Sequence, residues 1–259
     1  MRMASIKITL LGHASFRLEP DSGEVVYFDP WLDENPVCSL GVADVEAADL
    51  VIATHGHNDH IGDSFAICRK TGATFAGNYE LCLTAEKNGL ELGLRAKPFN
   101  PGGTIEAAGV RVTATQAFHS LSMSPNQSLG ATPEDEYFRP DGAVCGIVMG
   151  FKNGTTVYNT SDTTVFSDMQ LISQMYGPQV AIMPVGGLYT MGIREAARAA
   201  SLIRPDIVIP CHYGEPQGQP ADIDALSNAV EFLSPNTQVV KLDPDGSVTY
   251  TTSSYSVDY

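Results

Sequence analysis

Short apolar runs rich in Val, Ile and Thr recur along the whole chain, and this pattern constrains the fold more than any other feature. Each run is bounded by Gly, Pro, Asn or Asp, and such runs predict β-strands because β-branched side chains pack well on a pleated surface. The strands predicted in this way cover residues 6–18, 24–28, 49–54, 110–115, 143–151, 155–160, 180–185, 207–210, 237–242 and 247–251.

Other segments repeat apolar residues at the helical period, most clearly 193–203, where one face is apolar and the charged residues lie largely off it. Further helices are predicted at residues 63–71, 79–88, 167–176 and 221–233. Strands in succession, followed by strands that alternate with helices, predict mixed sheets with helices outside them. No Gly/Ser-rich or Pro-rich linker divides residues 1–259, so we expect a single domain. Each half has several strands followed by helices, which permits a pseudo-duplicated sandwich.

The net charge of the chain limits the classes of partner that it is expected to bind. The 259 residues include 30 Asp and Glu against 15 Lys and Arg, a formal net charge of −15. Such an excess of negative charge argues against a protein whose main task is to bind nucleic acid or an anionic membrane. No apolar run approaches the roughly 18–20 residues that a membrane-spanning helix needs. We therefore expect a small-molecule substrate and neither nucleic acid nor membrane as a partner, and a homo-oligomer is compatible with the sequence.

The start of the chain and its cysteines indicate a cytoplasmic protein. Lys7, His13 and Arg17 interrupt the apolar residues near the start, so we recognise no secretory signal. The cysteines form no C-x-x-C pair, which fits free thiols in a reducing compartment better than a disulfide framework. They are Cys38, Cys68, Cys82, Cys145 and Cys211.

The segment 120–140 has no clear period and is rich in Ser, Pro and other polar residues. Loops longer than about 12–15 residues are uncommon in compact domains and often form lids or binding loops. A lid and a disordered, solvated loop both remain open for this segment.

Three of the six histidines lie close together in the stretch THGHNDHIGD. His55 follows the predicted strand 49–54, so it begins a loop. Side chains two positions apart in an extended segment share a face, so His55 and His57 can converge on one point while Asp59 and His60 face a second. Imidazole and carboxylate donors without thiolate suit Zn²⁺, with Mn²⁺, Fe and Ni²⁺ as alternatives. The stretch thus predicts two adjacent cation sites.

These four side chains cannot saturate two metal ions, so other parts of the chain must supply ligands. His119, Asp162 and His212 are the candidates, because each follows a predicted strand as the histidine-rich stretch does. Strand ends gathered at one edge of a sheet sandwich are a natural place for a site built from loops on a rigid scaffold.

The arrangement resembles the metallo-β-lactamase superfamily, whose H-x-H-x-D-H motif is matched in full by THGHNDHIGD. The resemblance implies an α/β (α+β) fold, a four-layer αββα sandwich of two mixed sheets with outer helices. It also implies a ligand set in which His55, His57 and His119 bind the first metal, Asp59, His60 and His212 bind the second, and Asp162 bridges both.

More closely, the chain is similar to bacterial metal-dependent hydrolases related to ascorbate-6-phosphate lactonase. Two departures concern the substrate: relatives commonly have glycine in place of Ser161, before the bridging aspartate, and the segment 120–140 is longer than usual. The stretches that carry the similarity cover nearly the whole chain and are LGHASF, FDPWLDENP, HIGD, PGGT, SDTTVFSDM, PVGGLYTMG and IPCHYGEP.

Two divalent cations outweigh the carboxylates of Asp59 and Asp162 in charge, so positive charge remains to stabilise a hydroxide and an oxyanion. Metal ions about 3.5–4 Å apart can lower the pKa of a bridging water and polarise a carbonyl or phosphoryl oxygen. Water then becomes the nucleophile without a Ser-His-Asp triad. Asp59 could also accept the proton and pass it to the leaving group.

Several residues have two interpretations. His13, in LGHASF, can act in catalysis by lining the pocket or contacting substrate without binding metal, or can be a hydrogen-bonded core residue. Asp29 and Asp63 can orient ligand histidines, or can set a turn and a helix cap. The glycine-bearing loop 186–190 can form a pocket wall or a plain turn. Cys211 is expected to be a small core residue and not a nucleophile.

The favoured function is hydrolysis of a lactone, another ester or an amide of a small molecule. Cleavage of a small phosphorylated substrate is an alternative, because the same ions could cleave a phosphodiester, while the net charge argues against long polyanions. A di-iron redox protein and a non-catalytic metal-binding protein are further alternatives on the same fold. In di-iron relatives a carboxylate generally replaces the second histidine of the motif, so His57 favours hydrolysis.

Overall fold

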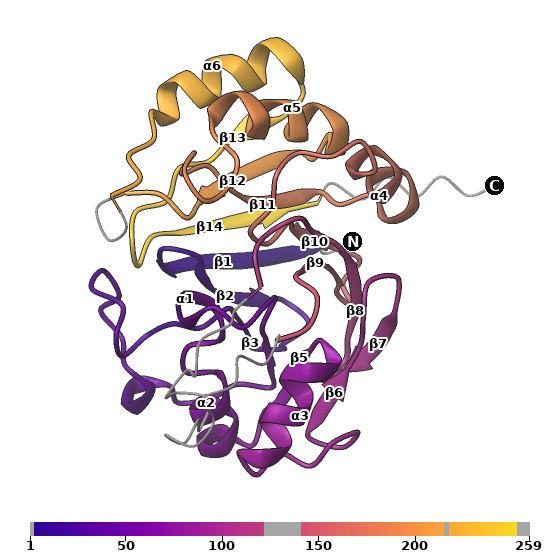
Figure 1. Ribbon diagram of the computed structural model, residues 1–259. Helices are drawn as coiled ribbons and strands as arrows, with labels where there is room; N and C mark the ends of the chain where they lie inside the picture. The colour runs from indigo at the N-terminus through magenta and orange to yellow at the C-terminus, as the bar shows by residue number, and fades with distance from the viewer. Residues whose placement is uncertain (1–2, 122–140, 215–217, 253–259) are drawn as a thin grey trace, which may run out of the picture.

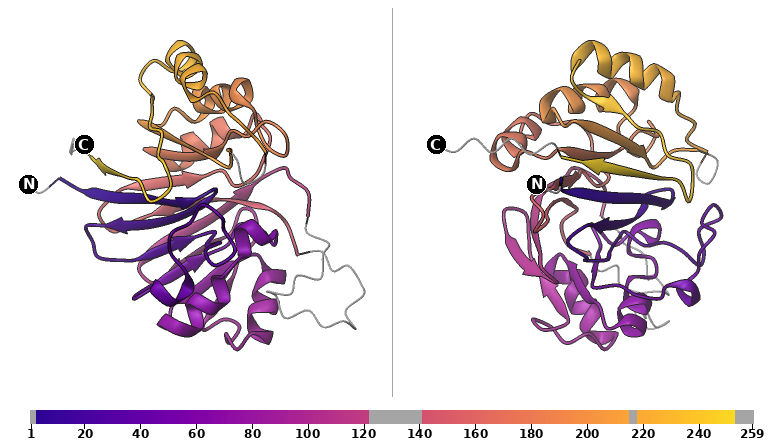
Figure 2. Two further views of the ribbon diagram at one scale, coloured as in Figure 1. Left: turned by 90° about the vertical axis from the view of Figure 1, so that its left-hand side faces the viewer. Right: turned by 180° about the vertical axis from the view of Figure 1, so that it is seen from behind.

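The computed structural model describes residues 3–121, 141–214 and 218–252. Two β-sheets face each other and helices cover their outer faces, so the layers run helix, sheet, sheet, helix (Figure 1). The N-terminal part of the chain builds one half and the C-terminal part builds the other, except that the last strand returns to the N-terminal sheet (Figure 2). This is the αββα sandwich predicted from the sequence. Of the predicted loop 120–140, residues 122–140 lie outside the described residues.

The N-terminal sheet has seven strands in the order β14-β1-β2-β3-β4-β5-β6. Its strands are β1 (Ser5–Gly12), β2 (Ser15–Pro20), β3 (Val26–Phe28), β4 (Leu50–Ile52), β5 (Thr74–Gly77), β6 (Ala96–Pro98) and β14 (Ser247–Thr251). The helical elements of this half are η1 (Val42–Asp44), α1 (Asn58–Ile61), α2 (Ser64–Thr71) and α3 (Tyr79–Lys87).

The C-terminal sheet also has seven strands, in the order β13-β12-β11-β10-β9-β8-β7. Its strands are β7 (Thr104–Ala107), β8 (Val110–Gln116), β9 (Cys145–Gly150), β10 (Thr156–Asn159), β11 (Val180–Pro184), β12 (Ile207–Cys211) and β13 (Gln238–Val239). The helices of this half are α4 (Met169–Tyr176), α5 (Ile193–Ile203) and α6 (Ile223–Leu233).

The two sheets have the same order of strand pairings. In the N-terminal sheet the pairs from β14 to β3 are antiparallel and those from β3 to β6 are parallel. In the C-terminal sheet the pairs from β7 to β10 are antiparallel and those from β10 to β13 are parallel. Strand β1 therefore corresponds to β8, and β4 corresponds to β11. The sandwich is pseudo-duplicated, as the order of strands and helices permitted.

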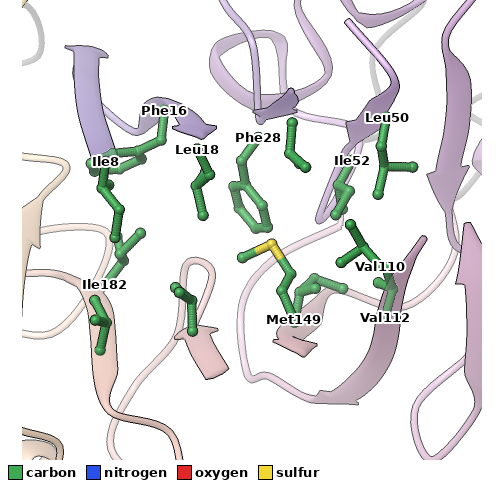
Figure 3. Packing of buried hydrophobic residues seen from close by; sticks show 14 of the residues in the cluster. Ile8, Phe16, Leu18, Phe28, Leu50, Ile52, Val110, Val112, Met149 and Ile182 are labelled. Carbon is green, nitrogen blue, oxygen red and sulfur yellow. The ribbon is translucent and has the colours of Figure 1, made fainter. Parts of the chain in front are cut away.

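The main core lies between the two sheets, where apolar side chains of both inner faces pack together (Figure 3). Adjacent residues of a strand point to opposite faces, so Met149 packs in this core whereas Val148 faces the helices. Each fully buried side chain of this size contributes about 1.5–3 kcal/mol of transfer free energy. The side chains labelled in Figure 3 are Ile8, Phe16, Leu18, Phe28, Leu50, Ile52, Val110, Val112, Met149 and Ile182.

Local signals set the helix boundaries. The side chain of Asn78 accepts a hydrogen bond from the amide of Leu81 at 2.8 Å and so caps the start of α3. A cap of this kind stabilises a helix by about 1 kcal/mol. Gly72 and Gly177 adopt the left-handed conformation that ends α2 and α4. The predicted helices are all confirmed, with small differences at their ends.

The strand predictions were less complete. The run 6–18 was wrong as a single strand, because the chain reverses at residues 13–14 and forms the hairpin of β1 and β2. Strands β5, β6 and β7 were not predicted, since each has only three or four residues and none is a β-branched run. They are strands because neighbouring strands offer their backbones hydrogen-bond partners, which local composition does not encode.

None of the helices in the described ranges is long and apolar enough to cross a membrane. The five cysteines are all free thiols, in agreement with the expectation of no disulfide framework. All but Cys38 are buried, and they pack as small apolar residues.

Candidate metal centre

The ends of several strands meet at one edge of the sandwich and bring the predicted ligands together. The motif loop follows β4, and His119, Asp162 and His212 follow β8, β10 and β12. His60 and Asp162 lie about a hundred residues apart in the chain, yet His60 Nε2 is 3.3 Å from Asp162 Oδ2. The stacking of the two sheets thus assembles the site.

The motif loop turns sharply after β4 into the single-turn helix α1. The amides of His60 and Ile61 both donate to the carbonyl of His57, at 3.0 and 2.9 Å. Gly62 ends the turn with a φ of 31°, and a Cβ there would lie 2.5 Å from the carbonyl oxygen of Pro30. The sequence predicted an extended segment here, but residues 54–57 form bends. The rings of His55 and His57 converge as expected, and the chain turns after them into α1.

His55, His57 and His119 form a first group of donors. His55 Nε2 lies 2.9 Å from His57 Nδ1. The centroid of the His119 ring lies 5.4 Å from that of His55 and 5.1 Å from that of His57. One donor atom of each residue lies within 4.8 Å of the other two, so the trio can hold one cation.

A second group surrounds the carboxylates of Asp59 and Asp162. His212 Nε2 lies 3.1 Å from Asp162 Oδ2 and 3.4 Å from Asp59 Oδ2. His60 Nε2 lies 3.3 Å from Asp162 Oδ2 and 3.8 Å from Asp59 Oδ2. His119 Nε2 is 3.6 Å from the same oxygen of Asp162, so this carboxylate lies between the two groups.

The distances between donor atoms in the second group fit residues that share one cation. A tetrahedral zinc ion with bonds of about 2.0–2.1 Å holds its donor atoms roughly 3.3–3.4 Å apart. The distances in the second group are 3.1–3.8 Å, longer than the roughly 2.7–2.9 Å of a charge-assisted hydrogen bond. His60 Nε2 is buried and makes no hydrogen bond within the described part of the chain, which is costly unless a ligand binds it.

The histidines and carboxylates of the second group shift one another's pKa. Burial alone would lower the pKa of His212, but Asp162 and Asp59 outweigh burial and raise it to about 9. The pKa of His60 is likewise raised well above its usual value against the effect of burial, by Asp162, Asp59 and Asp29. For Asp162, burial raises the pKa, but His60 and His212 hold it well below its usual value. The ionised carboxylates favour a cation here.

Asp29 orients His60 directly and His55 through Thr54. Its Oδ2 lies 2.8 Å from His60 Nδ1 and accepts a hydrogen bond from the hydroxyl of Thr54 at 2.8 Å. The same hydroxyl lies 3.0 Å from His55 Nδ1. Such contacts fix which imidazole nitrogen faces a metal, so Asp29 has the orienting role. Sequence reasoning missed Thr54, although its place directly before His55 was a signal.

Asp63 has the other of the two predicted roles. Its Oδ2 accepts hydrogen bonds from the amides of Leu32 and Asp33, at 2.7 and 3.0 Å. These bonds fix the loop after β3, so this carboxylate sets a turn.

His13, the remaining candidate, lies beside the second group. Its Nε2 is 3.3 Å from Asp59 Oδ2, and its ring centroid is 4.0 Å from that of His212. The structure therefore gathers all the histidines and both aspartates that the sequence singled out as site residues.

A cavity of about 280 Å³ opens at these donors. Tyr189 reaches it from the glycine-bearing loop after β11, which is closed by a hydrogen bond from the Gly187 amide to the Met191 carbonyl at 3.0 Å. The pocket-wall interpretation of that loop is therefore the one that fits. No lysine or arginine is among the described lining residues, which are His57, Asp59, His119, Ser120, Asp162, Tyr189 and His212.

Comparisons with known proteins agree with this geometry. The sequence profile of the family described as "Beta-lactamase superfamily domain" matches residues 7–212. A UPF0173 metal-dependent hydrolase of Methanopyrus kandleri is 39% identical over 239 residues, 92% of this chain and 97% of that protein. Another, of Herpetosiphon aurantiacus, is 38% identical over 249 residues, 96% of this chain and 99% of that protein.

The fold has a close counterpart in Igni18, a metallo hydrolase from Ignicoccus hospitalis. Its structure superposes with a TM-score of 0.79 at 32% identity, and the match covers 96% of this chain and 100% of that one. The family profile spans every residue of the gathered site, from His13 to His212. The chain therefore belongs to the β-lactamase superfamily, and within it to the UPF0173 metal-dependent hydrolases.

Proposed function

We propose that the protein hydrolyses an ester, lactone or amide bond of a small molecule at a centre of two divalent metal ions, with Zn²⁺ as the first choice. The observation that carries this proposal is the meeting of donors from β4, β8, β10 and β12 at the spacings of co-ligands. In this assignment His55, His57 and His119 hold one ion, Asp59, His60 and His212 hold the other, and Asp162 contacts both.

Two such ions supply an acidified water and a Lewis acid for a carbonyl oxygen. The protein then needs no thiol or hydroxyl nucleophile. Cys211, next to His212 in the chain, is fully buried, and burial raises the pKa of its thiol well above the usual value. A protonated, inaccessible thiol supports the interpretation of Cys211 as a core residue.

Asp59 is the residue we assign to proton transfer. Its side chain is 17% exposed and lines the cavity, whereas that of Asp162 is 4% exposed. Burial raises the pKa of Asp59, but His60, His13 and His212 outweigh burial and hold it far below its usual value. The carboxylate is therefore ionised at neutral pH, as a metal ligand must be. Its place in the wall of the cavity is what supports its role in carrying a proton from the attacking water to the leaving group.

The lining of the cavity favours a substrate without a large negative charge. Its described walls offer no lysine or arginine, and Tyr189 in its lining is 60% exposed. An uncharged lactone suits these walls. Cleavage of a small phosphodiester is the competing reaction, since the same ions would polarise a phosphoryl oxygen. His57 places nitrogen where di-iron relatives commonly carry a carboxylate, which favours hydrolysis over redox chemistry.

The proposal is tested by measuring metal content and kcat/KM on the same preparations. Zinc-loaded protein is assayed against lactones, thioesters, β-lactams and phosphodiesters, with the metal counted per chain by mass spectrometry. We expect turnover of a carboxylic ester or amide by protein that contains two ions, and its loss on exhaustive chelation.

Two variants separate the centre from its surroundings. His57→Ala should lower kcat/KM by about 10³-fold or more, because several kcal/mol of transition-state stabilisation depend on the metal. Asn58→Ala changes an exposed side chain in the same loop and should leave kcat/KM within about twofold. Activity that survives chelation or His57→Ala would overturn the proposal, and exclusive turnover of phosphodiesters would replace the ester assignment.

A further inference from the structure

His13 occupies the turn between β1 and β2, at the edge of the sandwich where the metal centre lies. Its side chain is buried, with a residue exposure of 5%. The backbone is held as well, because the amide of His212 donates to the carbonyl of His13 at 3.0 Å. The end of β1 is thereby joined to the end of β12, which carries a proposed ligand.

The backbone of His13 has a conformation that glycine would adopt at lower cost. Its φ is 57°, at the first position of the two-residue turn His13-Ala14. Hairpin turns with a positive φ at this position favour glycine, because any side chain there is strained. A non-glycine residue in this region costs on the order of 1–3 kcal/mol and is found mostly where function requires the side chain. The choice of histidine therefore points to its imidazole.

The ring of His13 faces the second group of donors. His13 Nε2 is 3.3 Å from Asp59 Oδ2, nearly the same spacing as the 3.4 Å from His212 Nε2 to that oxygen. One donor atom each of His13, Asp59 and His212 lie within 4.8 Å of one another. The three residues thus form a trio like that of His55, His57 and His119.

The contact between His13 and Asp59 lacks the geometry of a hydrogen bond. Neither ring nitrogen of His13 has a hydrogen-bond partner within the described residues. The neighbouring pair of His60 Nδ1 and Asp29 Oδ2 is 2.8 Å apart, which is the distance of a true hydrogen bond. The longer spacing at His13 is that of two donors to one ion of about 2.0–2.1 Å bond length.

The duplication of the sandwich supports the same assignment. Strand β1 holds in the N-terminal sheet the place that β8 holds in the C-terminal sheet. His119 follows β8 and completes the first trio, and His13 follows β1 and stands in the second. The two histidines occupy equivalent positions at the two halves of the centre.

We propose that His13 binds the second metal ion through Nε2, beside Asp59 and His212; this rests on the dinuclear centre proposed above. The second ion then has protein donors from His13, Asp59, His60, Asp162 and His212, whereas the first has only its three histidines and Asp162. A catalytic metal site keeps a position open for water or substrate. With fewer protein donors, the first ion would have more room for water or substrate than the second, which the protein would hold more completely.

The test measures the two metal affinities separately. Apoprotein is titrated with Zn²⁺ against a chromophoric chelator, as the wild type and as His13→Asn, because asparagine tolerates the positive φ of this turn. We expect His13→Asn to weaken the second binding event by about 100-fold and the first by less than about threefold. In Co²⁺-loaded protein, the proton NMR spectrum should lose one shifted imidazole N–H signal.

Two further variants make the result decisive. His119→Asn, at the equivalent position, should weaken the first event instead. Val37→Ala, which alters the wall of the cavity beside His13 without removing a donor, should change neither. Two wild-type affinities in His13→Asn, or an unchanged set of N–H signals, would overturn the ligand role of His13 alone. A wild-type chain that binds only one ion would overturn the dinuclear centre, and this inference with it.

Discussion

The two halves of the sandwich have the same order of strand pairings but supply the metal centre in different ways. In the N-terminal half, apart from His13 at the end of β1, one loop after β4 brings His55, His57, Asp59 and His60 within six consecutive positions. In the C-terminal half His119, Asp162 and His212 come one at a time from the ends of separate strands. One half thus holds a local binding element, while the other holds single donors that depend on the packing of the whole sheet.

Different interactions therefore position the donors of the motif loop and the donors of the C-terminal half. The turn of α1 and the hydrogen bonds of Asp29 and Thr54 arrange the donors of the motif loop. The donors of the other half reach them only because the inner faces of the two sheets pack together. Variants that change the hydrogen bonds behind the motif loop, and variants that change the packing between the sheets, can therefore test this comparison separately.

The largest effect is expected from Asp162, the residue of the C-terminal half that lies between both groups. Asp162→Asn should lower kcat/KM by about 10³-fold or more and weaken both metal sites, because it removes a charge worth several kcal/mol to the centre. Metal counting and kinetics measure the two effects. Asp168→Asn removes an exposed carboxylate of the following segment and should do neither. Two tightly held ions in Asp162→Asn would contradict the shared role.

The next largest effect concerns the packing between the sheets. Met149 is fully buried there, so Met149→Ala should lower the free energy of unfolding by about 2–5 kcal/mol, as measured in urea. Met175 is 62% exposed on α4, and Met175→Ala should cost less than about 0.5 kcal/mol. Equal losses from both variants would mean that the inter-sheet core does not dominate the stability of the scaffold.

A smaller effect, on metal affinity, is expected from Asp29, which contacts the motif loop through Thr54 and His60. Asp29→Asn should weaken metal binding about 10- to 100-fold, because the carboxylate that orients His60 and Thr54 loses its charge. Asp63→Asn is the matched variant, since that carboxylate contacts only loop amides among its described hydrogen bonds. Calorimetric titration with Zn²⁺ compares them. Equal weakening in both would show that loop structure, and not orientation of His60, explains the result.

The smallest effect is expected from a change of pH on the Tm of the metal-free protein. The pKa of His212 rises from 6.5 to about 9 on folding, and that of His60 shifts in the same direction. A raised histidine pKa stabilises the fold fully below about 6.5, and the contribution disappears as the pH rises through about 9. The Tm of the apoprotein should therefore fall across this interval, and bound metal should reduce the fall because it requires neutral imidazole. A Tm that rises from pH 6.5 to 9 without metal would contradict the charge assignment.

The sequence predicted the five helices of eight residues or more and most of the longer strands, because their periodic or β-branched residues carry the signal locally. It did not predict the short helical turns η1 and α1. It did not predict β5, β6 and β7, whose few residues become strands only beside existing partners. The histidines and aspartates that the structure brings together had been singled out from the sequence, by the motif and by positions after predicted strands. Their roles as ligands stay a prediction. Thr54 was missed although it directly precedes His55, because its position does not reveal that its hydroxyl meets that ring. Ser120 was missed because nothing in its local sequence marks it as a lining residue.

The amino-acid sequence alone determined the kind of chemistry, through a motif whose donors lie close enough in the chain to act together whatever the rest of the fold does. Only the tertiary structure decided how His13 is used, because its partners Asp59 and His212 are 46 and 199 positions away in the numbering. Asp59 comes from another strand end of the same sheet, and His212 meets His13 only across the stacked sheets. Contacts within a few residues follow from local geometry. Contacts across the sandwich depend on the burial of apolar side chains throughout both sheets, which no short stretch of sequence specifies.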